Sequence, residues 1–508
     1  MSPSENNKRI VKNTLMLYIR MILVMGVNLY IVRIVLQVLG EVDYGIYNVV
    51  AGVIVMISFF SGTMSSASQR FFAFELGNKN KEKLKKTFSV TVSIYLLLSV
   101  IILVLLETVG LWFLNNKMTI PADRMSAANW VFQFSILSFL MTMFAIPYKS
   151  LIIAYEKMSI YAYISIFEVG LRLMLVFALT LLQYDKLIVY AFLMFCVAGL
   201  TFFSFRFFCQ RHFSESKFSF IWDGSLFKSI LSYSGWNMFG SLAAVMNNHG
   251  VNILLNLFFG PVVNAARGIA FQFSNGLNQF VQNFVLAIKP QVTKYYAAGD
   301  NENMISLVYR SSKFSFFLLL LLTTPFLLES SFIMTLWLSE VPDYLIVFLQ
   351  LIIVNTLVDS LSYSLLTAAQ AQGKMRRYQI IVGGTLLMNT PISYLFLKAG
   401  YEPQVTMHVG IIFSFLAMCL RLLLLTRLIP LTIIGFFRHV FLRVMIVVTT
   451  STVPLFYFVS MFPEGTMRFV ISATGGILIT ILSISFFGVT KSERSSLWLY
   501  FRTKFPVW

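Results

Sequence analysis

Long uninterrupted apolar runs recur along the whole chain, and each is long enough to cross a lipid bilayer as a helix. A membrane-spanning helix needs about 20 mostly apolar residues, whereas an outer-membrane barrel shows alternating segments of about ten. We therefore predict an all-α polytopic membrane protein with 14 transmembrane helices. The predicted spans are residues 14–37, 44–66, 88–110, 125–147, 159–182, 186–207, 230–257, 262–287, 313–337, 342–367, 379–397, 403–426, 440–461 and 467–488.

The composition excludes several function classes. Of the 508 residues, 58% are hydrophobic and only 12% are charged, whereas a soluble domain is about half apolar and about a quarter charged. These values exclude a soluble enzyme, a nucleic-acid-binding protein and a disordered chain. The three cysteines (Cys196, Cys209 and Cys419) are odd in number and widely spaced, so we expect no disulfide framework, no metal site and no cofactor.

The basic residues predict the orientation in the membrane. The net charge of +18 would suit nucleic acid in a soluble protein, but here it indicates loops that face an anionic membrane surface. With the N-terminus inside, 29 of the 39 Lys and Arg lie in inward segments and only five in outward loops. The start, MSPSENNKRIVKN, lacks the features of a signal peptide. We expect both termini in the cytoplasm.

Two parts of the chain resemble each other at an offset of about 220 residues. Residues 37–46 align with 257–266, which places Gly40 opposite Gly260, and residues 69–90 align with 289–314. Two amphiphilic segments that look alike by chance are the alternative. Because six predicted helices precede the seventh, we predict two six-helix lobes and a terminal helix pair. The expected parts are residues 1–212, residues 213–428, and residues 429–508 with a basic cytoplasmic tail.

Polar residues inside predicted spans are functional candidates, because a charge within the bilayer is costly. The first span holds Arg20, Asn28 and Arg33. Arg33 lies near the outer end, where its side chain can snorkel to the headgroups. Arg20 lies deeper and either lines a cavity or reaches the inner headgroups.

The seventh and eighth spans are rich in amides. Asn248, Asn252 and Asn256 recur every four residues in the seventh span, and His249 beside them is a proton sensor or a core residue. The eighth span continues with Asn264, Arg267, Asn275, Asn278, Gln279 and Gln282. Such amides can join helices by hydrogen bonds, but their number favours a water-filled cavity with hydrogen-bonding walls.

Glu168 and Asp359 are candidates for coupling to an ion. Glu168 has the spacing of an intrahelical ion pair with Arg172, which is the simpler interpretation. Asp359 has no basic neighbour in sequence, so it either binds a proton or cation or is a protonated or hydrogen-bonded core residue. The four histidines show no metal-ligand spacing, and no signature of an enzyme is present.

Four segments of the chain are typical of a known family. They are LGEVDYGIYNVV (39–50), SQRFFAFELGNKNKEKLKKTF (68–88), IPYKSLIIAYEKMSIYAYISIFEVGLRL (146–173) and NAARGIAFQFSNGLNQFVQNFVLAIKPQVTKYYAAGD (264–300). With these segments the chain resembles the polysaccharide-transporter branch of the multidrug/oligosaccharidyl-lipid/polysaccharide exporter (MOP) superfamily, which contains the lipopolysaccharide and capsule repeat-unit flippases of bacteria. The resemblance spans residues 8 to about 430.

The resemblance implies a MATE-like fold, in which two six-helix lobes surround a cavity that opens alternately to each side. It implies a functional monomer in the bacterial cytoplasmic (inner) membrane. This monomer would move a polyprenyl-pyrophosphate-linked oligosaccharide (an O-antigen, capsule or exopolysaccharide unit) from the inner to the outer leaflet. The expected substrate-binding residues are Arg20, Asn28, Arg33, Asn248, Asn252, Arg267, Asn275 and Gln279.

The first span departs from the drug-exporting relatives, which often carry an acidic residue there. Arg20 and Arg33 stand in this span instead, and guanidinium pairs well with diphosphate oxygens. The main alternative is a drug or metabolite exporter of the same superfamily, coupled to protons or sodium through Asp359 or Glu168. An intramembrane enzyme and a passive scramblase are further alternatives.

Overall fold

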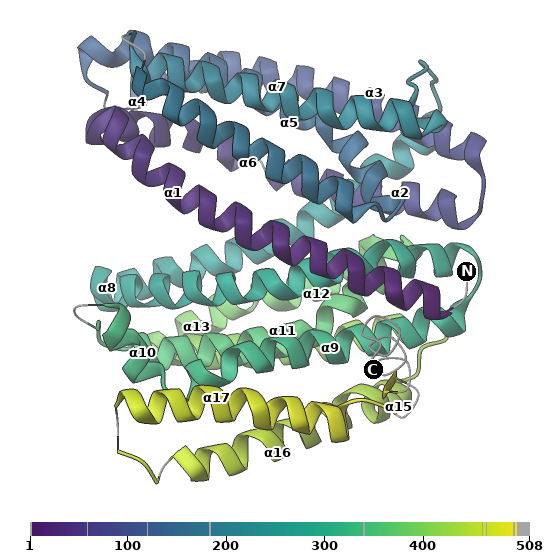
Figure 1. Ribbon diagram of the computed structural model, residues 1–508, viewed down its shortest axis with the longest axis vertical. Coiled ribbons are helices and arrows are strands. Elements are labelled where there is room, and N and C mark those ends of the chain that lie inside the picture. Colours follow the sequence, from purple (N-terminus) through teal and green to yellow (C-terminus); the bar gives the residue numbers. More distant parts are fainter. Residues whose placement is uncertain are drawn as a thin grey trace, which may run out of the picture. The chain divides into compact units, whose positions relative to one another are not determined.

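Every regular element in the described part of the chain is a helix, as the sequence predicted. The computed structural model describes residues 3–57, 59–118, 120–181, 184–338, 341–459, 461–463, 465–490 and 493–494. Figure 1 labels the elements. The longer helices are α1 (Pro3–Ile57), α2 (Phe59–Gly77), α3 (Lys81–Leu105), α5 (Met125–Ala154), α6 (Met158–Leu181), α7 (Lys186–His212), α8 (Gly224–Ala297), α9 (Asn301–Leu328), α11 (Leu345–Gln372), α12 (Met375–Leu387), α13 (Asn389–Lys398), α14 (Val405–Thr426), α16 (Leu442–Val459) and α17 (Thr466–Ser483). Shorter ones are α4 (Leu111–Lys117), α10 (Ser330–Trp337) and α15 (Ile433–Phe436).

Twelve helical stretches of the described chain are long and apolar enough to cross a membrane. The two predicted spans that are absent from this set are residues 44–66 and 262–287. The first runs from the end of α1 into α2 across residue 58, which lies outside the described residues. The second is the later part of α8, where Arg267 and several amides lower the hydropathy. The chain is thus a multi-pass membrane protein, and the count of 14 stays a prediction.

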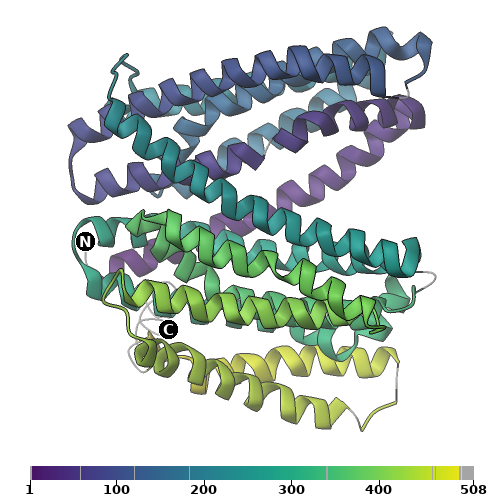
Figure 2. The same ribbon diagram turned by 180° about the vertical axis from the view of Figure 1, so that it is seen from behind.

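The chain divides into two compact units. The N-terminal unit is Lys12–Met238, and the C-terminal unit is Met1–Val11 together with Phe239–Trp508. In the N-terminal unit α5 packs against α7 and α2, and α3 packs against α2 and α5. In the C-terminal unit α11 packs against α9 and α14, and the terminal helices α16 and α17, yellow in Figures 1 and 2, pack against each other and against α9.

Both units contain the same backbone kink at the glycine pair that the repeat aligned. Gly40 bends α1 with φ 76° and ψ 170°, and Gly260 bends α8 with φ 81° and ψ −174°. This region of φ and ψ is essentially restricted to glycine, because a Cβ atom would clash with the backbone. The predicted correspondence between Gly40 and Gly260 is confirmed by these angles.

A second feature recurs at the same offset of 220 residues. The turn after α2 has a positive φ of 56° at Lys79, and the turn after α8 has 75° at Gly299. The next residue in each turn caps the following helix: the Asn80 side chain accepts from the amide of Lys83, and the Asp300 side chain accepts from the amide of Asn303. The two halves therefore share their turns as well as their kinks.

Ion pairs connect the terminal helix pair to α9 of the C-terminal unit. Arg468 of α17 lies 2.8 Å (Nε to Oε1) from Glu329 at the end of α9. Glu493, which follows α17, lies 2.8 Å (Oε2 to Nζ) from Lys313 of α9. The first turn of α17 and the residues that follow α17 thus both form ion pairs with α9 or its C-terminal end. Residues 495–508, which hold most of the predicted basic tail, lie outside the described residues.

Candidate functional site

Several of the polar residues that the sequence singled out line one cavity of the C-terminal unit. This cavity has a volume of about 380 Å³ and is enclosed by α8, α11, α13 and α14, with Leu386 of α12 also contributing. Its lining includes Asn248, Arg267, Asn275 and Asp359. We call it the C cavity. Its size lies in the range of small-ligand sites in proteins.

Arg267 is the most buried charge of the C cavity, with 5% of its surface exposed. It lies about two turns after the Gly260 kink, which brings the second part of α8 beside the first. One guanidinium nitrogen, Nη1, donates to Oδ1 of Asn252, and Cζ lies 5.5 Å from the ring of Phe271. In the described part of the chain Nε is buried without a hydrogen-bond partner. Arg267 therefore has a donor to offer to a bound ligand.

Amides and hydroxyls form the rest of the polar wall. Asn389 Nδ2 donates to Asn247 Oδ1 at 2.9 Å, and the hydroxyl of Tyr363 donates to Asn278 Oδ1 at 3.2 Å. Asn355 Nδ2 donates to Asp359 Oδ2 at 3.4 Å, while its own Oδ1 is buried without a partner among the described residues. The C cavity thus offers both an unfilled donor and an unfilled acceptor, which suits a ligand that carries hydroxyls.

The N-terminal unit has a cavity of its own, which we call the N cavity. It has a volume of about 510 Å³ and is lined by residues of α1, α5, α6 and α7. Asn28 and Arg172 line it, and Arg172 forms the predicted ion pair with Glu168. The rings of Tyr47 and Tyr190, also in the lining, meet edge to face at a centroid distance of 4.8 Å. The one charged residue of this lining is therefore neutralised by its neighbour.

The two cavities occupy equivalent places in the two halves of the chain. Eight pairs of lining residues are separated by 220 positions, the offset of the two kinks. The pairs are Asn28 and Asn248, Ile31 and Val251, Tyr47 and Arg267, Ile54 and Ser274, Ser135 and Asn355, Phe139 and Asp359, Tyr190 and Gly410, and Met194 and Ser414. Where the N cavity has tyrosine, phenylalanine and methionine, the C cavity has arginine, aspartate and serine. The repeat has therefore produced one aromatic cavity and one charged cavity.

The remaining candidates of the sequence analysis lie elsewhere. Gln279 and Arg33 are exposed. Asn252 reaches the C cavity through its bond to Arg267. Arg20 does not line the N cavity; its guanidinium lies over the ring of Tyr161, at 4.9 Å from Cζ to the centroid.

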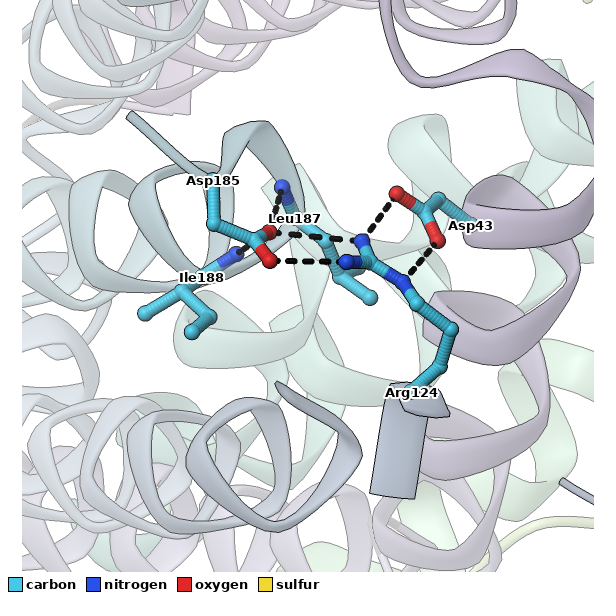
Figure 3. Close-up of polar contacts among 5 residues, drawn as sticks. All are labelled: Asp43, Arg124, Asp185, Leu187 and Ile188. Atoms are coloured by element: carbon cyan, nitrogen blue, oxygen red, sulfur yellow. Dashed lines mark hydrogen bonds and ion pairs between the residues drawn. The ribbon is translucent and has the colours of Figure 1, made fainter. Parts of the chain in front are cut away.

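A charge cluster that sequence analysis did not single out joins three segments of the N-terminal unit. Figure 3 shows Arg124, just before α5, between two carboxylates. Its Nε lies 2.8 Å from Asp43 Oδ1, and its Nη1 lies 2.8 Å from Asp185 Oδ2. Asp43 lies just beyond the Gly40 kink, and Asp185 caps α7 by accepting from the amides of Leu187 and Ile188.

The surroundings of Asp185 favour its ionised form. Burial alone would raise its pKa, but hydrogen bonds from Arg124 and from the amides of Leu187 and Ile188 lower the pKa below its usual range. Arg124 lies 61 positions from Asp185 in the sequence, whereas Leu187 lies only two positions away. The sequence could therefore predict the helix cap at Asp185 but not the ion pair with Arg124. The cluster holds the segment beyond the kink against the ends of α5 and α7.

Part of the chain is similar to a known protein family. Residues 17–178 match the model of the MatE family. No curated protein matches the chain in sequence. Among solved structures, the outward-facing conformation of a multidrug resistance MATE family transporter of the MOP superfamily matches with a TM-score of 0.71 and 15% identity, over 83% of this chain and 96% of that one.

Two further solved structures agree with this match. A MATE protein in the straight conformation gives a TM-score of 0.71 at 16% identity, over 83% of this chain and 96% of that one. A mutant of the Vibrio cholerae MATE transporter VcmN gives 0.70 at 17% identity, over 85% of this chain and 99% of that one. Two of the three matched proteins are transporters. Residues 17–178 are therefore similar to the MatE family, and the chain as a whole has the fold of the matched MATE structures.

Proposed function

We propose that the chain is a transporter that flips a polyprenyl-pyrophosphate-linked oligosaccharide from the inner to the outer leaflet of the bacterial inner membrane. In this proposal the two units change access alternately and no covalent bond is made or broken. The oligosaccharide enters a polar cavity while the polyprenyl tail stays in the lipid. The matched solved structures support transport through this fold, and the residues of the C cavity support the substrate class.

The observation that carries the proposal is the environment of Arg267. A guanidinium that is removed from water is costly unless an anion or hydrogen-bond acceptors surround it. Asn252 supplies one acceptor and the Phe271 ring a second contact, while the buried Nε lacks a partner within the described chain. A phosphate oxygen is the ligand that guanidinium binds best in this geometry.

The charge of the C cavity agrees with an anionic, hydroxyl-rich ligand. Its lining carries the cations Arg267 and Arg421 and the single carboxylate Asp359. The amides of Asn247, Asn248 and their neighbours provide donors and acceptors for sugar hydroxyls. A cationic drug would meet an excess of positive charge here.

A reconstitution experiment tests the proposal. Purified protein is placed in liposomes with a lipid-linked oligosaccharide, and the amount that reaches the opposite leaflet is measured by accessibility to a membrane-impermeant glycosidase. We expect Arg267→Gln to slow flipping by about 10- to 100-fold, the loss of one charge-assisted hydrogen bond. Arg377→Gln, an exposed arginine at the start of α12, is the matched control and should flip at the wild-type rate.

The solved structures favour a second candidate function, a cation-coupled drug or metabolite exporter. The multidrug resistance transporter shares this fold, and Asp359 places a carboxylate in the C cavity. Cells that express the chain would then resist cationic compounds, and Asp359→Asn would abolish the resistance. Resistance without oligosaccharide flipping would replace the first proposal by this one.

A further inference from the structure

The two halves of the chain differ in how deeply they bury one face of the helix that follows their shared turn. At the offset of 220 residues α3 corresponds to α9, so Leu97 and Val100 correspond to Phe317 and Leu320. Phe317 and Leu320 are each 2% exposed, whereas Leu97 is 47% and Val100 is 58% exposed. The terminal helix α17 packs against α9, with Gly488, just after α17, against the ring of Phe317. In the described part of the chain, α3 therefore exposes an apolar face that α9 buries.

This face of α3 forms one wall of an apolar groove. The groove has a volume of about 430 Å³ and is lined by α3, α5, the first turn of α8 and residues 213–223, which join α7 to α8 and which we call the linker. Apart from Ser93 and Ser99, every residue of its lining is apolar. Along α3 the lining runs from Ser93 to Leu103, a rise of about 15 Å, and the hydrocarbon core of a bilayer is about 30 Å thick. The groove therefore matches the depth of one lipid leaflet.

Polar contacts hold the linker on α3 at the mouth of the groove. The backbone amide of Ser219 donates to Ser89 Oγ at 3.3 Å, and Lys86 Nζ lies 2.7 Å from Asp223 Oδ2. Between these two anchors lies Trp222, which lines the groove and is 66% exposed. Tryptophan is enriched where the hydrocarbon core meets the headgroups. The position of Trp222 thus indicates that the groove opens at the level of the headgroups.

Basic residues surround this mouth. Residues 78–86 and 214–228 together contain seven lysines and three acidic residues. Lys85 is exposed and lies three helical turns before Leu96, which puts it on the same face of α3 as the lining of the groove. Basic residues at a membrane surface attract anionic lipids. The mouth therefore complements an anionic headgroup.

The lining favours a lipid chain over a helix of another protein. Helices in a membrane associate through small residues that let their backbones approach each other. The terminal helix pair follows this rule: a Cβ atom added at Gly476 or Gly488 would lie within 3.4 Å of a side chain of α9. The exposed face of α3 carries Leu96, Leu97 and Val100 instead. These large side chains would hold a helix at a distance, whereas a flexible hydrocarbon chain can lie between them.

We propose that this groove binds one acyl chain of an anionic phospholipid, whose headgroup lies beside Lys85 and the linker. The positive-inside pattern predicts that this end of α3 is cytoplasmic, so the lipid belongs to the inner leaflet. Lipid tails are as apolar as the groove, so the preference for this lipid comes from the charge at the mouth and the shape of the groove. The groove shares no lining residue with the N cavity or the C cavity, and the proposal does not depend on the proposed function.

Photo-cross-linking of lipids to the full chain in nanodiscs tests the proposal. The probes are photoactivatable phosphatidylglycerol and phosphatidylcholine with the same acyl chains, and labelling of the linker peptide is measured by mass spectrometry. We expect phosphatidylglycerol to label the linker about fivefold more than phosphatidylcholine, the value of about one basic residue at an anionic membrane surface. Lys85→Gln should remove this preference, whereas Lys157→Gln, an exposed lysine of another loop, should keep it. Leu97→Trp fills the groove and should remove most of the labelling. Leu200→Trp on α7 is its matched control, since Leu200 is 48% exposed, and should label as the wild type does.

Equal labelling by the two lipids would overturn the proposal, as would wild-type labelling in both Leu97→Trp and Lys85→Gln. Leu97→Ala widens the groove and should retain the preference for phosphatidylglycerol; its loss in this variant would also count against the groove. Two other occupants have distinct outcomes, and each would overturn the proposal. Displacement of phosphatidylglycerol by an equal amount of a polyprenyl phosphate would assign the groove to an isoprenoid chain. Cross-links between two copies of the chain at residue 97 would assign this face of α3 to an oligomer.

Discussion

Glu493 offers a stability test of how the terminal helix pair is held. Its carboxylate lies 2.8 Å (Oε2) from Lys313 Nζ and 3.5 Å (Oε1) from Arg310 Nε. It also accepts a hydrogen bond from the amide of Thr490, and the Thr490 hydroxyl oxygen accepts one from the amide of Glu493. Glu493→Gln keeps the shape of the side chain but removes its charge. The change leaves the buried ammonium of Lys313 beside a second cation.

The expected loss of stability in Glu493→Gln follows from the burial of both charged side chains. The side chain of Lys313 is 2% exposed and that of Glu493 is 7% exposed, so both charges are nearly removed from water. Breaking a buried pair by neutralising one partner costs about 3–5 kcal/mol, because the other charge stays buried and unpaired. We therefore expect Glu493→Gln to lower the free energy of unfolding of the C-terminal unit by about 3 kcal/mol.

A matched pair in the other unit serves as control. Lys81 lies 3.9 Å (Nζ) from Glu215 Oε1, but the Lys81 side chain is 80% exposed. Lys81→Gln should cost less than about 1 kcal/mol, because the ammonium is in water and lies 3.9 Å from the buried Glu215 carboxylate, which keeps its hydrogen bond with Tyr155. Unfolding is followed by titration with a denaturing detergent in mixed micelles. The double variant Lys313→Met/Glu493→Gln should be more stable than Glu493→Gln alone, since neither charge remains. A loss in Glu493→Gln no larger than in Lys81→Gln would refute this reasoning.

Three further predictions concern the kink, the charge cluster and the coupling candidate. Gly260→Ala should destabilise the C-terminal unit by about 1–3 kcal/mol in detergent unfolding, because the φ of Gly260 is 81°. Gly268→Ala is the control, since Gly268 lies in regular helix with open space at the Cβ position, and it should be neutral or slightly stabilising. The pKa of Asp185 is lowered in the folded state, so its contribution is present above the unfolded-state pKa and is lost as pH falls through the folded-state pKa. Arg124→Gln should thus flatten the acid side of the stability profile, and an unchanged profile would argue against the cluster. If flipping is not coupled to an ion through Asp359, the Asp359→Asn variant should flip the oligosaccharide at the wild-type rate in proteoliposomes. Loss of flipping in this variant would show that the carboxylate is required.

Much of the fold could be predicted because the bilayer restricts the chain to apolar helices of known length. The repeat could also be predicted, since Gly40 and Gly260 are needed for the same backbone angles. The count of 14 helices stays a prediction, because residues 44–66 and 262–287 are absent from the twelve apolar stretches. The second of these spans has a physical reason. There the amides that line a cavity also lower the hydropathy by which a span is recognised.

The candidate site was only partly predictable. The cost of a polar side chain in a membrane makes Asn248, Arg267 and Asp359 candidates from the sequence alone, and all three line the C cavity. Periodicity along one helix could not show that Asn252 bonds to Arg267 across the kink. Nor could it show that Lys149 lies over the same ring as Arg20, since that contact depends on how α5 and α6 pack.

The central claim is that Arg267 binds the phosphate of a lipid-linked oligosaccharide. Its most direct test is the initial rate of flipping in proteoliposomes for the wild type, Arg267→Gln and Arg377→Gln at equal protein content. We predict flipping by the wild type and by Arg377→Gln, and a rate reduced by about 10- to 100-fold in Arg267→Gln. Equal rates in all three proteins, or no flipping by the wild type, would contradict the account.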